Sequence, residues 1–217
     1  SALEEVVLPK SLTSIGTRAF QGSGLKAIEL PEGIDTISER AFANCSSLKE
    51  MVLPETIETI GTYAFEGSSG MISINIPEKV TEIKEGTFKD CTNLSEVKLS
   101  EGLTTIYAYA FQNCNGLTSI ELPDSITKLG ARAFYNCQKL EEVGYPLGWT
   151  SVLDYDRHSD SYYSDSYSYY SSPFEGCSAL KRIEVEEGAT AIPKHAFQNM
   201  SALEEVVLPK SLTSIGT

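Results

Sequence analysis

Cysteine is the residue type in this chain best suited to chemistry, and its spacing is regular. Cys45, Cys91, Cys114, Cys137 and Cys177 each lie three residues after a phenylalanine. A zinc site requires paired spacings such as C-x-x-C together with converging histidines, and the sequence has none. Serine or methionine fills the same slot elsewhere in the sequence, and this interchange favours free, buried thiols over disulfides or nucleophiles. We predict no cofactor.

Histidine gives no better indication of catalysis. His158 lies in an irregular segment, and His195 occupies a slot that elsewhere holds arginine or tyrosine. A Ser-His-Asp arrangement would require an activated serine near one of them, and the sequence contains no G-x-S-x-G phrase. No group of candidate catalytic residues departs from the regular spacing. We therefore predict that the protein is not an enzyme.

The irregular segment of residues 154–170 reads DYDRHSDSYYSDSYSYY and contains six tyrosines, five serines and four aspartates. Antibody binding loops favour tyrosine and serine, because tyrosine gives a large amphipathic contact at low entropic cost. The lack of aliphatic residues is equally typical of a disordered, low-complexity segment. Under the binding hypothesis, the residues that contact a partner are Tyr155, Tyr162, Tyr163, Tyr167, Tyr169 and Tyr170.

The aspartates of this segment offer a weak calcium alternative. Asp154, Asp156, Asp160 and Asp165 sit at positions 1, 3, 7 and 12 of an EF-hand-like loop. The glycine that such a loop requires is replaced by Ser159, and its final glutamate is replaced by an aspartate. The leading prediction is therefore that no metal is bound.

The elements that would position these residues form a repeat anchored by phenylalanine, with successive gaps of 22, 23, 23, 23, 23, 40 and 23 residues. Each unit contains an L-x-x-I-x-L phrase that alternates like a strand, then usually a proline that ends it. A second extended phrase follows, and the unit closes on Ala-Phe, which we expect to form one helical turn. The anchors are Phe20, Phe42, Phe65, Phe88, Phe111, Phe134, Phe174 and Phe197.

The phrase from Leu117 to Cys137, LTSIELPDSITKLGARAFYNC, resembles the BspA-like class of leucine-rich repeats. Coils of that family read L-x-x-I-x-L-P-x-x-I-x-x-I-G-x-x-A-F-x-x-C, and the match covers the chain apart from one insertion. The resemblance implies a bacterial surface or secreted protein, as most members of the family are, and some members are similar to adhesins that bind host matrix proteins. The family defines a scaffold without shared catalytic residues.

These observations predict an α/β repeat solenoid: a right-handed leucine-rich-repeat coil with a parallel sheet on one face and short helical turns on the other. We expect one domain over residues 1–217, with about nine 23-residue coils and an inserted loop at 154–170. Residues 1–17 and 201–217 are identical, which favours a duplicated block and a fragment of a longer array. Such uncapped ends are expected to associate head to tail.

The charge balance limits the class of partner. With 17 Lys+Arg against 30 Asp+Glu, the net charge is -13, which disfavours nucleic acid. No apolar run approaches the roughly 18 to 20 residues of a membrane span, and no secretion signal is recognisable. An extracellular or cell-surface location therefore follows from the family resemblance alone.

Glutamates recur at positions of the first phrase that should face outward, and four of them are predicted to bind a partner: Glu50, Glu96, Glu121 and Glu142. Such an acidic face suits a basic protein segment, although it could equally be a solvated face that keeps the array soluble. The leading functional hypothesis is a surface-displayed binding or adhesion module for a protein or glycan ligand, such as a host matrix protein. The alternative is a passive structural spacer in a long repeat array.

Overall fold

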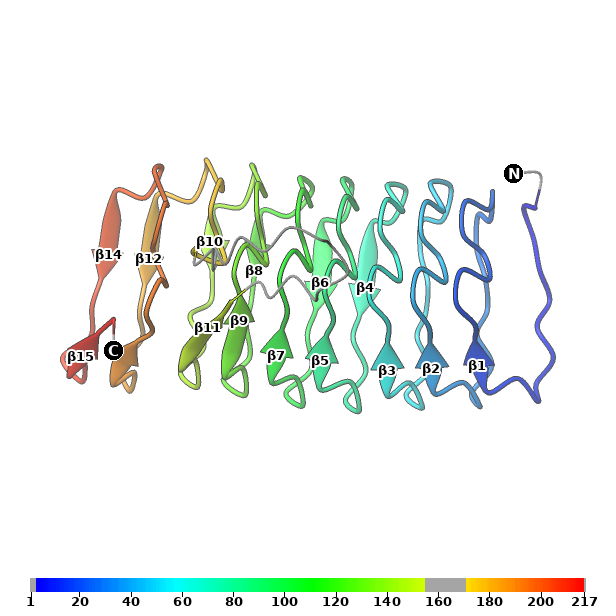
Figure 1. Ribbon diagram of the computed structural model, residues 1–217, viewed down its shortest axis with the longest axis horizontal. Coiled ribbons are helices and arrows are strands. Elements are labelled where there is room, and N and C mark those ends of the chain that lie inside the picture. The colour runs from blue at the N-terminus through cyan, green and yellow to red at the C-terminus, as the bar shows by residue number, and fades with distance from the viewer. Residues whose placement is uncertain (1–2, 155–170, 217) are drawn as a thin grey trace, which may run out of the picture.

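In the computed structural model, which describes residues 3–154 and 171–216, the chain winds into an elongated solenoid of about eight turns. The two ends of the chain lie at opposite ends of the long axis (Figure 1). Each turn contributes short strands, and these pair in parallel with strands of neighbouring turns, except between the turn of β10 and β11 and the turn of β12 and β13. Stacking, rather than contacts within one turn, therefore provides the fold's long-range order.

The first ladder of strands comes from the L-x-x-I-x-L phrase. Its register places Ser73 opposite Glu96, Ser119 opposite Glu142, and Arg182 opposite Glu205. Side chains alternate between the interior and solvent, as the sequence pattern predicts. The strands of this ladder are β4 (Ser73–Asn75), β6 (Glu96–Lys98), β8 (Ser119–Ile120), β10 (Glu142–Val143), β12 (Arg182–Glu184) and β14 (Glu205–Val207).

The second ladder comes from the second extended phrase and forms the longest sheet, in the order β11-β9-β7-β5. Its β-branched inward residues, such as Ile37, Ile60 and Ile83, are fully or almost fully buried. The solenoid thus has two strand-bearing faces. The strands are β1 (Ser14–Ile15), β2 (Thr36–Ile37), β3 (Thr59–Ile60), β5 (Glu82–Ile83), β7 (Thr105–Ile106), β9 (Lys128–Gly130), β11 (Ser151–Leu153), β13 (Ala191–Ile192) and β15 (Ser214–Ile215).

The Ala-Phe segment of each unit forms a corner of successive turns, here called the phenylalanine corner. Around Phe42, the amides of Ala41 and Ala43 donate to the carbonyl three residues back, whereas the amides of Arg40 and Phe42 donate to the next coil. Arg40 and Asn44 have φ angles of 53° and 59°. A helix cannot form here, because it needs a run of right-handed residues and amides that donate four residues back.

The prediction of an α/β solenoid with helical turns is therefore wrong. No residue described by the structure is helical, and the fold is a parallel-strand β-solenoid. Hydrogen bonds between coils replace those that a helical turn would make within itself. The equivalent residues of other coils, including Tyr63, Tyr109 and Arg132, have the same left-handed conformation.

The phenylalanine rings form the internal stack that the spacing predicts. Successive rings from Phe20 to Phe174 lie 5.1–5.6 Å apart, centroid to centroid, and are close to parallel. The rings of Phe42, Phe65, Phe88, Phe111 and Phe134 are completely buried. Leucines of the first phrase, such as Leu48 and Leu117, pack into the same core. The aromatic stack and the aliphatic core together hold successive coils in register.

The cysteine slot is buried, as predicted, and the structure gives the reason for its composition. Each cysteine thiol donates to the carbonyl of the phenylalanine in the preceding coil, as in Cys114 Sγ to Phe88 O at 3.2 Å. Ser68 makes the equivalent bond to Phe42 O at 2.6 Å. The slot therefore suits a small side chain that can donate a hydrogen bond. Burial raises the pKa of the Cys91 and Cys114 thiols, so they are poor nucleophiles.

Candidate functional site

Three of the four predicted glutamates share one row on the exposed side of the first ladder, here called the strand-face row. It consists of Glu50, Ser73, Glu96, Ser119 and Glu142, and its glutamates are exposed. Because serine separates each glutamate from the next, the carboxylates lie two coils, or about 9.6 Å, apart. The strand face is therefore less densely acidic than its glutamates suggested.

The fourth predicted residue, Glu121, lies in a neighbouring row. Its equivalent in the coil before is Lys98, and in the coil after it is Gly144. A Cβ atom on Gly144 would lie 2.4 Å from Glu121 Oε2, so the absence of a side chain there makes room for this carboxylate. The structure therefore does not bring Glu121 into line with the other three.

A denser acidic row lies at the corner where the chain turns after the first phrase, here called the proline corner. In five successive coils the second residue of this turn is acidic and exposed, whereas the equivalent residues of other coils include Lys10, Leu147 and Lys210. The turns are closed by equivalent bonds, such as Ile57 N to Pro54 O at 3.0 Å and Ile126 N to Pro123 O at 2.9 Å. This proline-corner row consists of Glu32, Glu55, Glu78, Glu101 and Asp124.

The proline-corner row is unbroken over five successive coils, so its carboxylates recur about every 4.8 Å. Among the residues that the structure describes, none of the five forms an ion pair. By contrast, strand-face acids near the two ends are paired, as in Lys26 with Glu4 at 2.6 Å and Arg182 with Glu205 at 3.0 Å. Glu50, Glu96 and Glu142 of the strand-face row form no ion pair within the described residues either, so the proline-corner row differs in its density: it has a carboxylate in every coil rather than in every second coil. Sequence reasoning missed this row, although four of its five acids directly follow a proline, which signals it.

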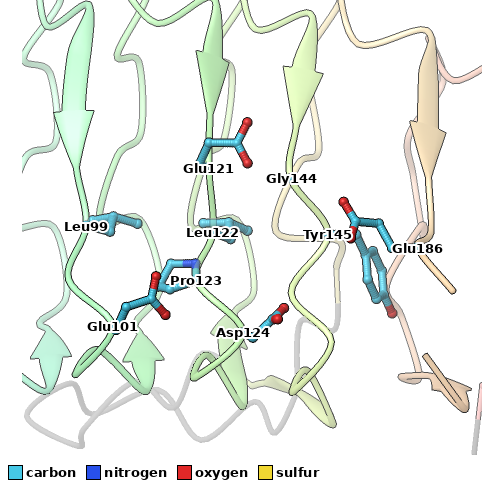
Figure 2. Close-up of a pocket in the computed structure, with 9 residues that line it drawn as sticks. All are labelled: Leu99, Glu101, Glu121, Leu122, Pro123, Asp124, Gly144, Tyr145 and Glu186. Atoms are coloured by element: carbon cyan, nitrogen blue, oxygen red, sulfur yellow. The ribbon is translucent and has the colours of Figure 1, made fainter. Parts of the chain in front are cut away.

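A pocket of about 250 Å³ lies where the proline corner meets the end of the first ladder. Figure 2 shows the carboxylates of Glu101, Glu121, Asp124 and Glu186 arranged around it. Its floor is partly apolar, with Tyr145 at one side. Such a pocket can accept a cationic group carried on an aliphatic stem, such as a lysine or arginine side chain.

The tyrosine-rich segment lies almost wholly outside the described residues. All six tyrosines, together with Asp156, Asp160 and Asp165 of the calcium alternative, belong to residues 155–170. Asp154 is described and directly follows β11. Within the described ranges, no group of three or more histidine, cysteine or acidic side chains could hold a metal ion. In the same ranges, no helix has the length and apolar character to cross a bilayer.

A family model described as a BspA type leucine rich repeat region matches residues 1–91, 59–155 and 161–217, in six copies. Comparison with curated protein sequences gives no match. The family match covers well over half of the chain and includes the residues on which the sequence resemblance was based.

Solved structures with a similar fold include three bacterial proteins. A leucine-rich repeat protein from Bacteroides ovatus is 26% identical, with a TM-score of 0.63, and the match covers 99% of this chain and 63% of that one. A T. pallidum leucine-rich repeat protein is 24% identical, with a TM-score of 0.50 over 88% and 73% of the two chains. The pneumococcal vaccine antigen PcpA is 22% identical, with a TM-score of 0.52 over 93% and 57%. This chain thus spans less than two thirds of the B. ovatus protein.

Proposed function

Because the chain belongs to the BspA-type leucine-rich repeat family, we propose that it is a protein-binding module displayed on a bacterial surface. The observation that carries this proposal is the proline-corner row, with five exposed carboxylates in successive coils and no ion pair among them. Solenoids of this kind offer long, continuous surfaces to their partners. The charge of the row favours a basic, extended segment of another protein.

The pocket beside Glu121 and Asp124 would anchor such a segment. An extended chain advances about 3.3 Å per residue, so a segment of some six residues spans the five carboxylates. A lysine or arginine side chain of that segment would enter the pocket, where its stem would contact Leu122. The tyrosines of residues 154–170 would supply a second contact. Such binding depends on unpaired surface charges and should weaken as salt is added.

A passive spacer is the alternative, and one observation favours it. Backbone bonds at the phenylalanine corner continue past the insertion, as in Phe134 N to Pro173 O at 2.8 Å. A spacer needs only such continuous stacking, whereas a binding module needs a surface whose removal abolishes recognition. Substitutions that change the surface and leave the core intact separate the two.

The test replaces three carboxylates of the row, Glu55→Gln, Glu78→Gln and Glu101→Gln, in one variant. A control variant carries Glu4→Gln, Glu204→Gln and Glu205→Gln, which removes the same number of charges from paired positions near the two ends. Binding of a lysine-rich peptide and of a glutamate-rich peptide is measured by calorimetry at low and physiological salt.

We expect the row variant to lose at least about tenfold in affinity for the lysine-rich peptide, equivalent to about 1.4 kcal/mol. The control should lose less than about twofold, and the glutamate-rich peptide should not bind. Equal losses in the two variants would mean that only net charge matters, which would contradict a site at the proline corner. No binding to the parent protein would favour the spacer.

A further inference from the structure

The contact between the coil of residues 131–153 and the coil of residues 171–192, here called the insertion joint, lacks the strand pairing found elsewhere. Within the described residues, β10 does not pair with β12, and β11 does not pair with β13. Every other contact between successive coils keeps a parallel pair or bridge in at least one ladder. Figure 1 shows the wider spacing at this place.

The phenylalanine corner, by contrast, is intact across the insertion joint. The amides of Arg132 and Asn136 donate to Ser172 O at 3.1 Å and Glu175 O at 3.0 Å. The Arg132 guanidinium also holds the Glu175 carboxylate with two bonds, of 2.8 Å and 3.1 Å. The hydrogen bonds between these two coils thus follow one edge of the solenoid, which is the geometry of a hinge with its axis along that edge.

The core at the insertion joint is also unlike that of other coils. Tyr145 and Trp149 occupy positions that hold Leu122 and Ile126 in the preceding coil, and their rings lie 5.4 Å apart. The position equivalent to Trp149 in the next coil is Ala189, since both amides close the same kind of turn. Two large rings therefore precede a coil with a small side chain at the equivalent position, and the strands on either side are not hydrogen-bonded to one another.

The hydroxyl of Tyr145 is buried and has no hydrogen-bond partner in the described structure. Burial raises the pKa of this phenol to about 12, so the group stays protonated and keeps a donor to satisfy. A buried hydroxyl without a partner disfavours the closed arrangement, and separation of the two coils would hydrate it. At the other contacts between described coils, which keep ladder hydrogen bonds, no buried hydroxyl lacks a hydrogen-bond partner.

We propose that the insertion joint is a hinge: the segments before and after it open about the phenylalanine corner, while the rest of the solenoid stays rigid. Opening moves Glu186 away from Glu121 and Asp124, because Glu186 alone among the pocket residues follows the joint. The hinge therefore changes the shape of the pocket. It does not depend on the identity of any partner.

Spin labels give a matched test, because residues 1–17 and 201–217 are identical. Val7→Cys with Lys98→Cys spans four coil steps without the insertion joint, and Lys98→Cys with Val207→Cys spans four steps that include it. The native thiols are buried, so labels attach to the introduced cysteines. Pulsed dipolar spectroscopy then gives a distance distribution for each pair.

The pair across the joint should show a distribution at least about twice as broad, or a second, longer distance. Equal widths for the two pairs would overturn the hinge. Tyr145→Phe, which removes the unpartnered hydroxyl, should narrow the distribution across the joint. Tyr107→Phe, which removes a hydroxyl bonded to Glu82, should leave it unchanged.

The single tryptophan gives an independent readout, because Trp149 packs edge-on against Phe174 across the joint at 6.5 Å and is buried. Quenching of its fluorescence by acrylamide should fall about twofold in Tyr145→Phe and stay constant in Tyr107→Phe, since only the former favours closure. Unchanged quenching in Tyr145→Phe, together with an unchanged distance distribution, would exclude this hydroxyl as a cause of opening.

Discussion

At the phenylalanine corner, every ring from Phe20 to Phe174 lies within 5.6 Å of the next. Backbone amides there bond from coil to coil even across the insertion joint. At the proline corner, the same repeat period places exposed carboxylates, which form no ion pair with any residue that the structure describes. Residues covered by coils on both sides are thus restricted in size and hydrogen bonding. Side chains that face solvent at the proline corner are restricted only by the backbone geometry of the turn. Charged side chains that recognise a partner can therefore occupy these positions.

Loss of a central ring should have the largest effect on stability. Phe111→Ala removes a fully buried side chain that stacks on Phe88 and Phe134. We expect a loss of about 3–5 kcal/mol in the free energy of unfolding, measured by denaturant titration. A loss below about 1 kcal/mol would contradict the account of the stack as the chief constraint on this corner.

The ion pair at the phenylalanine corner should have the next largest effect. Burial by itself raises the pKa of the Glu175 carboxyl, but hydrogen bonds from Arg132 and Ser171 outweigh burial, so this pKa is lowered. The stabilisation is therefore fully present above the ordinary glutamate pKa of about 4.3 and is lost as pH falls through the lower, folded-state value.

Glu175→Gln should accordingly cost about 1.5–3 kcal/mol at pH 7, because the partly buried Arg132 loses a charged acceptor. The difference in unfolding free energy between parent and variant, measured from pH 7 down to pH 3, should shrink toward acid. A difference that is constant over this range would show that the Glu175 charge does not stabilise the corner.

The cysteine slot should respond to the loss of a donor more than to the loss of sulfur. Cys114→Val leaves Phe88 O without its thiol donor and should cost about 1 kcal/mol. Cys114→Ser keeps a donor, as Ser68 does in its coil, and should cost less. Thermal unfolding of both variants would show the order, and a more stable valine variant would mean that packing alone sets this slot.

Deletion of residues 154–170 should have the smallest effect on stability. Joining Leu153 to Ser171 restores the 23-residue spacing of Phe174 from Phe134. We expect a cooperative transition within about 1 kcal/mol of the parent, because loop closure costs little at this length. A non-cooperative or strongly shifted transition would mean that the segment takes part in the core. If the tyrosines contribute to recognition, the same deletion should weaken binding.

The buried half of the fold could be read from the sequence. The period of the phenylalanines predicts the ring stack, the alternation of the first phrase predicts its strands, and regular spacing predicts that the cysteines are buried. Trp149 lies 23 residues after Ile126, an apolar position of the second phrase, and it is buried as that spacing indicates. These predictions are correct because each depends only on one unit that is repeated along the solenoid axis.

The backbone conformation of the phenylalanine corner and the acidic row of the proline corner could not be predicted as well from the sequence. Arg40, Tyr63 and Arg132 have left-handed backbones, although only glycine and asparagine commonly signal that conformation. Stacking forces it on them, since their amides bond to the next coil. The proline-corner row was missed for a different reason: its residues lie in a turn, where no alternation of apolar and polar residues marks which side chains face outward.

Cross-linking of a bound lysine-rich peptide to the parent protein tests the division between the two corners most directly. A carbodiimide joins lysine amines to nearby carboxylates, and mass spectrometry identifies the acids that react. We predict cross-links concentrated on Glu32, Glu55, Glu78, Glu101 and Asp124. Cross-links centred on the strand-face row at Glu50, Glu96 and Glu142, or spread over all exposed acids in proportion to their exposure, would contradict the account.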